Sequence, residues 1–167
     1  MAGRAEREAD DEGHSVNVHC RSYRGATNEW QTPPDILAAL GPFDDDPAQA
    51  NSLDGFLRPW HGLVFLNPPY GPGIGEWLQK LSEHGSGVAL IFARTETRWF
   101  IESVWKKARS LRFLYGRPHF YLNGQRAVGN CGGPLVLVAY GEEGDRRVRE
   151  TTLAGMYVRL HQNGGVS

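Results

Sequence analysis

The chain has 167 residues, the size of one ordinary domain, and 40% of them are hydrophobic, which is enough for one buried core. No apolar run approaches the roughly 20 residues that span a bilayer, and the charged N-terminus has no apolar segment of a secretory signal. Two isolated cysteines, with no HExxH motif and no His/Cys cluster, predict a reducing cytoplasm and no metal site. These features argue against a membrane protein, a disulfide scaffold and a zinc protein.

Polar, charged residues 1–27 predict a disordered tail, and we expect one domain over 28–160 with a flexible C-terminus at 161–167. The first predicted helix begins after Thr32, which can cap it, and ends at Gly41. Unbroken apolar runs predict buried strands, and apolar residues at helical spacing predict helices. The predicted strands are 63–66, 87–93, 111–115 and 134–140, the helices are 74–84 and 95–108, a loop covers 51–62, and 146–160 adds one or two short strands.

Apolar strands that alternate with helices indicate an α/β fold, with a parallel-type sheet covered by helices on both faces. Ligands of such sheets bind at the carboxyl ends of the strands. This rule selects three polar loops, 44–48, 67–73 and 94–97, which we expect at one edge of the sheet.

The second of these loops begins with Asn67, Pro68, Pro69 and Tyr70, directly after an apolar strand. An exocyclic aromatic amine is a poor nucleophile, and acceptors for its N–H groups stabilise the positive charge that develops when it is alkylated. The Asn67 side chain and the Pro68 carbonyl are two such acceptors, and Tyr70 provides a flat face for an unstacked base. The alternative is a strand-ending turn with a buried tyrosine.

The motif NPPYG after an apolar strand resembles the catalytic motif of amino-group methyltransferases that use S-adenosylmethionine. The ordered motifs EWQTP, FDDDPA, NPPYGPGIGEW, ARTETRWF, FLYGRPHF and GPLVLVAY resemble, more narrowly, the phage-type DNA N6-adenine methyltransferases, a Dam-like family. The resemblance covers about 28–141. It implies a reduced Rossmann-like methyltransferase sheet, S-adenosylmethionine as cofactor, double-stranded DNA as substrate and a bacterial host cytoplasm as location.

The resemblance also assigns roles to single residues. Catalytic roles fall on Asn67, Pro68, Pro69 and Tyr70; cofactor binding falls on Trp30, Thr32, Asp44, Asp46, Pro47, Asn67, Arg94 and Thr95; DNA contacts fall on Tyr70, Arg98, Arg117 and Arg126. Trp30 as a buried anchor and Arg117 as a structural hydrogen-bond donor are the alternatives. The chain departs from the family pattern at Asp45. Only about 20 residues separate Asp46 from Asn67, so either the sheet is reduced or Asp46 follows a different strand than usual.

Charge is unevenly distributed along the chain. Residues 1–55 carry four Arg and eleven Asp or Glu, a balance of −7, whereas residues 94–126 carry eight Arg or Lys and two Glu, a balance of +6. The second region is a candidate for polyanion contact, and an ordinary solvated helix face is the alternative.

Two further functions remain open at this level. The motif also permits transfer to cytosine N4, an RNA base or a glutamine side chain. A catalytically inactive DNA-binding relic of the fold is the third possibility, although Asn67 and Tyr70 are both present.

Overall fold

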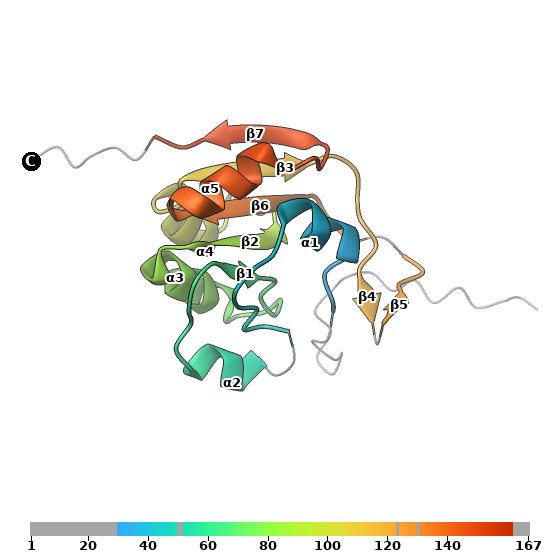
Figure 1. Ribbon diagram of the computed structural model, residues 1–167, viewed down its shortest axis with the longest axis horizontal. Coiled ribbons are helices and arrows are strands. Elements are labelled where there is room, and N and C mark those ends of the chain that lie inside the picture. Colours follow the sequence, from blue (N-terminus) through green and yellow to red (C-terminus); the bar gives the residue numbers. More distant parts are fainter. Residues whose placement is uncertain (1–29, 50–51, 123, 130, 162–167) are drawn as a thin grey trace, which may run out of the picture.

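The computed structural model describes residues 30–49, 52–122, 124–129 and 131–161 (Figure 1). The predicted tail at 1–27 and residues 162–167 of the predicted flexible C-terminus lie outside the described residues.

A five-stranded mixed sheet forms the centre of the fold. The order of its strands is β1 (Val64–Leu66), β2 (Gly87–Phe92), β6 (Leu135–Tyr140), β3 (Ser110–Leu114) and β7 (Gly155–Arg159). β1 and β2 pair in parallel, whereas β2–β6, β6–β3 and β3–β7 pair antiparallel, so β3 runs in the same direction as β1 and β2. The predicted parallel-type sheet is therefore wrong for β6 and β7.

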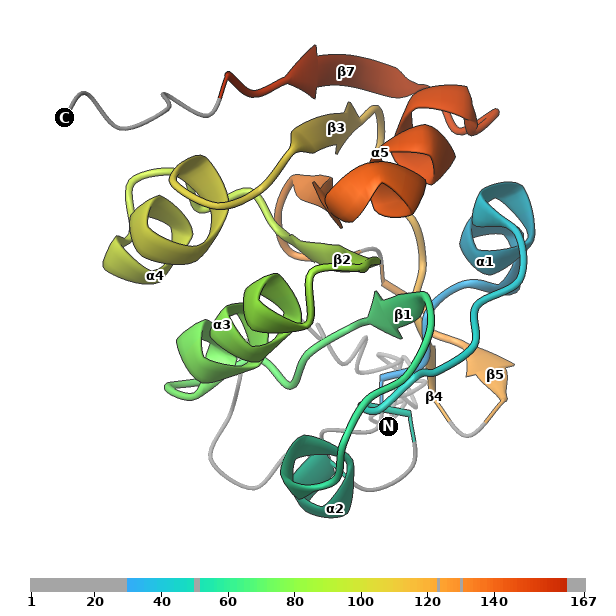
Figure 2. The same ribbon diagram turned by 60° about the vertical axis from the view of Figure 1, so that its left-hand side comes forward.

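Helices cover both faces of this sheet, which confirms the α/β class (Figure 2). The buried apolar residues form two clusters, one on each face of the sheet, because consecutive residues of a strand point to opposite faces. One face carries α1 (Pro34–Leu40) and α5 (Gly141–Glu150), and the other carries α3 (Ile74–His84) and α4 (Arg98–Phe100), which continues as the π-helical η1 (Ile101–Trp105).

The chain forms a short helix, α2 (Ser52–Leu57), where the sequence predicts only a loop. Two side chains outside α2 hold its end. The Trp60 indole donates to the Gly55 carbonyl at 2.8 Å, and the Lys80 ammonium donates to the Phe56 carbonyl and, at 2.7 Å, to the Arg58 carbonyl. These contacts satisfy carbonyls that a helix end leaves unpaired.

The C-terminal part of the domain also differs from the prediction. Residues 141–150 form α5, and only 155–159 form a strand. The arginine Arg112, on β3, donates to the carbonyls of Val148 and Arg149 at 2.8 and 3.0 Å, at the end of this helix. A small hairpin, β4 (Tyr121–Leu122) and β5 (Gln125–Arg126), is likewise absent from the prediction.

The acidic segment before α2 extends the sheet beyond β1. Asp45 forms a parallel bridge with Val64, with hydrogen bonds of 2.9 Å from Asp44 N to Leu63 O and from Phe65 N to Asp45 O. The crossover between these parallel segments, residues 46–63, includes the short helix α2 and meets the dozen or more residues that parallel strands need. Asp46 therefore follows the segment that lies beside β1, the strand that Asn67 follows.

Candidate active site

Four segments that run in the same direction end at one edge of the sheet. Asp46 follows the Asp45 bridge, Asn67 follows β1, Arg94 follows β2, and Tyr115 follows β3. The three loops that the sequence selects therefore share one edge, as predicted, and the loop after β3 joins them.

The Asn67 side chain is fixed in one orientation. Its Nδ2 donates to the main-chain carbonyl of Trp30 at 3.1 Å. Because a carbonyl can only accept, the amide nitrogen must face Trp30, and Oδ1 must face the opposite way. Oδ1 is buried and accepts no hydrogen bond from any residue that the structure describes. A buried acceptor without a donor is costly in a folded protein, so this oxygen is a candidate ligand-binding atom.

Of the three residues after Asn67, Tyr70 packs against both core clusters. Pro68 is buried, whereas Pro69 and Tyr70 are half-buried. The Tyr70 ring packs against Phe92, at the end of β2, with ring centroids 4.6 Å apart and planes inclined by 44°. This packing joins the loop after β1 to the end of β2 and fixes the position of the predicted base platform.

Two of the three consecutive aspartates have structural partners. Asp44 Oδ2 accepts from the Leu63 amide at 2.7 Å, at the entry to β1. The buried Asp45 accepts two hydrogen bonds from Arg58, at 2.5 and 2.7 Å, which hold its pKa below the usual value. Asp45, where the chain departs from the family pattern, is thus an ion-pair partner. It connects the segment that pairs with β1 to the segment after α2.

Asp46 has a different environment from its two neighbours. Burial raises the pKa of its carboxyl to about 6; the charge of Asp45 also raises it, and the Ala48 amide opposes the shift. Asp46 borders a cavity of about 430 Å³ between the end of α1 and the Phe43–Phe65 pair, whose ring centroids are 5.1 Å apart. A carboxyl beside aromatic rings, with no cation among its described partners, is suited to a ligand that brings its own positive charge or hydroxyls.

We expect Asp46→Asn to change the pH dependence of stability. The folded protein holds the Asp46 proton more tightly than the unfolded chain, so this group lowers the free energy of unfolding as pH rises from about 4 to about 6. Relative to wild type, the variant should gain about 2 kcal/mol across that window. Urea unfolding of both proteins at pH 4, 5, 6 and 7 measures the difference, and a difference that is constant with pH would contradict the assignment.

The other predicted cofactor residues vary in exposure. Pro47 is buried, and its carbonyl lies so close to Gly55 of α2 that a side chain at Gly55 would overlap it. Thr32 is half-buried, two residues after Trp30. Arg94 is exposed, and its carbonyl accepts from Thr97 N at 3.0 Å and Thr97 Oγ1 at 2.8 Å, so the loop after β2 is a closed turn. The carbonyl of the next residue, Thr95, accepts from the Trp105 indole at 3.1 Å.

The basic region from 94 to 126 divides into two groups. Four of its side chains bind within the domain: Lys106 to Glu102, Lys107 to Gln79, Arg109 to Glu142, and Arg112 to carbonyls around α5. The other four, Arg94, Arg98, Arg117 and Arg126, are exposed and form no ion pair with a described residue. The first three of these follow the carboxyl ends of β2 and β3, on the same edge as Asn67, and Arg126 lies on the hairpin beyond β3.

The segment 30–33 connects this edge to the β4–β5 hairpin, a link that the sequence does not reveal. Gln31 pairs with Tyr121 through two main-chain hydrogen bonds of 2.8 and 3.1 Å, while the carbonyl of the preceding Trp30 holds Asn67. Arg117 and Arg126 line a cavity beside the hairpin, whereas Phe120 is buried in the core. Within the motif FLYGRPHF, Arg117 is thus available to a ligand, whereas Phe120 is not.

Comparison of the chain with protein-family models, curated proteins and solved structures found no match. Across the described ranges no helix has the length and apolar character needed to cross a membrane. In the same ranges no three His, Cys, Asp or Glu side chains gather in a way that could hold a metal ion.

Proposed function

We propose that this protein is a DNA methyltransferase that transfers a methyl group from S-adenosylmethionine to N6 of adenine. The observation that carries the proposal is the geometry of Asn67. Its Nδ2 is committed to the Trp30 carbonyl, and its buried Oδ1 lacks a donor among the described residues, at the carboxyl edge of the sheet.

The Asn67 oxygen suits an amine that becomes positively charged. An acceptor held in place before the reaction does not have to reorient when charge develops, and burial strengthens its interaction because the local dielectric is low. Pro68 adds a main-chain carbonyl one residue away, and proline has no N–H that would compete as a donor. The two acceptors match the two N–H groups of an exocyclic amine, and Tyr70 provides the ring face for the flipped base.

Asp46 and the cavity beside it fit the cofactor. The carboxylate is half-buried without a cationic partner among the described residues, and the cavity wall contains Phe43 and Phe65. An ammonium or a pair of ribose hydroxyls would bind the carboxylate, and a flat heterocycle would pack on the partly exposed Phe43 ring. When bound, S-adenosylmethionine supplies a methyl group on a sulfonium, ready for direct displacement. In this proposal Trp30, Thr32, Arg94 and Thr95 close the site around it. Asp44 uses Oδ2 to accept from the Leu63 amide, which leaves Oδ1 for the cofactor.

Double-stranded DNA is the substrate that the charge arrangement supports best. Arg94, Arg98, Arg117 and Arg126 have no ion pair with described residues; the first three follow strands that end at the edge that carries Asn67, and Arg126 lies on the β4–β5 hairpin. Exposed arginines of this kind bind phosphates and set the register of a DNA duplex. The overall charge is −1, so the contact is local to this edge.

Methyl transfer to purified DNA tests the proposal. The protein is incubated with tritiated S-adenosylmethionine and DNA that lacks adenine methylation, and the nucleosides are then identified by mass spectrometry. We expect N6-methyladenine. N4-methylcytosine would assign the other exocyclic amine of DNA, and transfer only to RNA or to a glutamine-containing protein in parallel incubations would assign an acceptor outside DNA. The absence of both transfer and thermal stabilisation by S-adenosylhomocysteine would indicate an inactive relic.

A further inference from the structure

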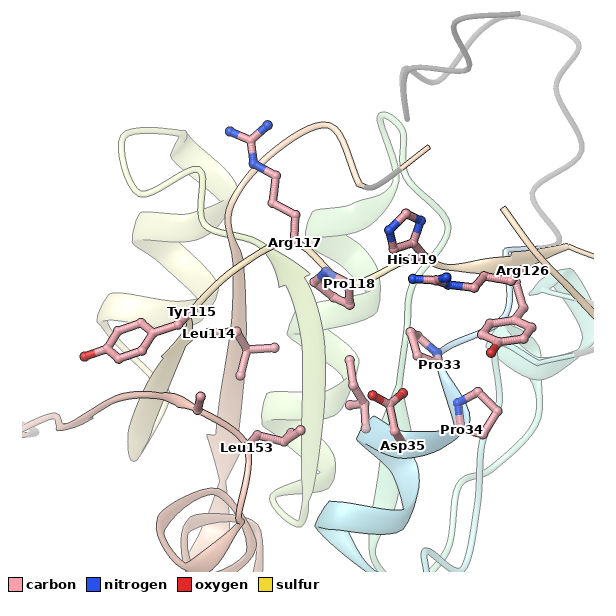
Figure 3. Close-up of a pocket in the computed structure, with 13 residues that line it drawn as sticks. Pro33, Pro34, Asp35, Leu114, Tyr115, Arg117, Pro118, His119, Arg126 and Leu153 are labelled. Carbon is pink, nitrogen blue, oxygen red and sulfur yellow. The ribbon is translucent and has the colours of Figure 1, made fainter. Parts of the chain in front are cut away.

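A second basic cavity lies at the edge of the sheet opposite to Asn67. The cavity that Arg117 and Arg126 line adjoins the end of β3 (Figure 3), whereas the second, of about 450 Å³, adjoins the start of β3 and the end of β7. Arg109 and Tyr115 flank β3 and are six residues apart, so the two edges lie about 20 Å from each other. The second cavity, which we call the opposite-edge cavity, is therefore remote from the proposed reaction.

Basic side chains gather around the opposite-edge cavity, and none of its described lining residues is acidic. The lining consists of Lys107, Arg109, Gly141, Arg159, Leu160 and His161. Arg159 and His161 are exposed, and neither forms an ion pair with a described residue. Positive charges that lie close together repel each other, and a bound anion offsets this cost.

Arg109 is the most firmly held of these basic residues. Its amide donates to the Ala139 carbonyl at 2.8 Å, and its carbonyl accepts from the Leu160 amide at 3.0 Å, so its backbone is fixed between β6 and β7. Its side-chain Nε is buried and donates no hydrogen bond to a described residue; Asp145 Oδ2 lies 3.7 Å away. A guanidinium that is held in place before a ligand arrives loses little conformational entropy when the ligand binds.

Two carboxylates of α5 face Arg109, and they differ in what they leave available. Glu142 Oε1 accepts from Arg109 Nη2 at 3.1 Å, but the Glu142 side chain is 85% exposed, so the pair is weak and a ligand can replace it. The buried Asp145 accepts from the Tyr157 hydroxyl at 2.6 Å and lies 3.6 Å from Arg149. Asp145 therefore positions Arg109 from behind and does not line the cavity.

The charges around the cavity match those of a phosphate monoester. Lys107, Arg109 and Arg159 supply three permanent positive charges, and the Glu142 carboxylate lowers the balance to +2. A phosphate monoester carries about −1.5 to −2 at pH 7, and guanidinium groups bind its oxygens in pairs. We infer that the opposite-edge cavity binds the phosphate group of a small phosphate monoester.

The size and surroundings of the cavity favour a small molecule over a DNA backbone. A volume of about 450 Å³ lies within the range of small-molecule sites, so an organic group fits beside the phosphate. Each phosphate of a DNA backbone carries only one negative charge, and the exposed Glu142 beside the cavity repels a long polyanion. The inference does not depend on the proposed methyl transfer, because the two sites lie at opposite edges.

Isothermal titration of the full chain with inorganic phosphate and with ribose 5-phosphate, at constant ionic strength in chloride buffer, tests the inference. Wild type should bind one ribose 5-phosphate per chain, at least as tightly as inorganic phosphate. Arg159→Gln should weaken binding by about tenfold or more, because one charged hydrogen-bond donor is lost. Lys107→Gln should weaken it as well, which provides a second test if one variant does not fold.

Two further variants separate a specific site from general charge attraction. Glu142→Gln removes the competing carboxylate and should tighten binding by about two- to fivefold. Arg146→Gln is the matched control for Arg159→Gln, because it removes one exposed arginine of α5 that does not line the cavity, and it should bind as wild type does.

Three results would overturn the inference. The first is no heat of binding at millimolar ribose 5-phosphate, whether or not inorganic phosphate binds. The second is equal affinity of wild type and Arg159→Gln with both proteins folded. The third is displacement of ribose 5-phosphate by a DNA duplex with hydroxyl ends, dependent on Arg159, because it would assign the cavity to a nucleic-acid backbone.

Discussion

Asn67→Ala should lower methyl transfer to DNA by about 10²–10³-fold, the loss typical for removal of one preorganised group that stabilises transition-state charge. The variant loses the buried Oδ1 acceptor and, with it, the hydrogen bond to the Trp30 carbonyl. The Asp46 cavity does not include Asn67, so binding of S-adenosylhomocysteine should largely survive. Single-turnover transfer of tritiated methyl groups measures the rate, and isothermal titration measures the binding.

Asn67→Gln distinguishes the position of the acceptor from its chemistry. Glutamine keeps the amide but moves it by one methylene, and a displacement of about 1 Å in a reacting site costs about 10²-fold. Both variants should unfold within about 1–2 kcal/mol of wild type, since only one partly buried hydrogen bond is affected. Transfer by Asn67→Ala at the wild-type rate, with folding intact, would exclude the proposed role.

The position of the site was predictable because it depends on strand direction alone. Two predicted strands, 63–66 and 87–93, end in candidate loops. Both are present in the structure, as β1 and β2, and they run in parallel. β6 was predicted with the wrong direction because an unbroken apolar run reads the same in both orientations. The antiparallel β6 leaves the site unchanged, since β3 on its other side again runs with β1 and β2.

The elements that the sequence missed are held by contacts between distant residues. The buried residues of α5 are Gly144, Asp145 and Val148, and only Val148 has an apolar side chain, so the charged run GEEGDRRVRE has no apolar stripe that would predict a helix. The ion pair of Asp45 with Arg58, 13 residues away, likewise leaves no local pattern. The orientation of the Asn67 side chain leaves no local pattern in the sequence either, because it depends on the Trp30 carbonyl, 37 residues earlier in the chain.

Gly144→Ala should destabilise the protein by about 2–3 kcal/mol, against the expectation from helix propensity. In an exposed helix this change stabilises by up to about 1 kcal/mol, because alanine has the better propensity. At Gly144, however, a Cβ would overlap the carbonyl oxygen of Gly87, and that oxygen belongs to the backbone of β2 and cannot rotate away. The helix must move off the sheet instead, and overpacking of this kind costs more than the propensity gain.

The displacement should extend to α1, because α5 holds that helix through two side chains. Arg147 donates to the Leu40 carbonyl at 2.8 Å, and Thr151 Oγ1 donates to the Ala39 carbonyl at 3.1 Å. The cavity beside Asp46 is bordered by the end of α1, so Gly144→Ala should also weaken the binding of S-adenosylhomocysteine. Urea unfolding and titration calorimetry measure the two effects. For the unfolding measurement Gly71→Ala is the matched control, since a Cβ there meets no atom within 4 Å; equal or higher stability of Gly144→Ala would show that α5 can shift away from β2 without cost.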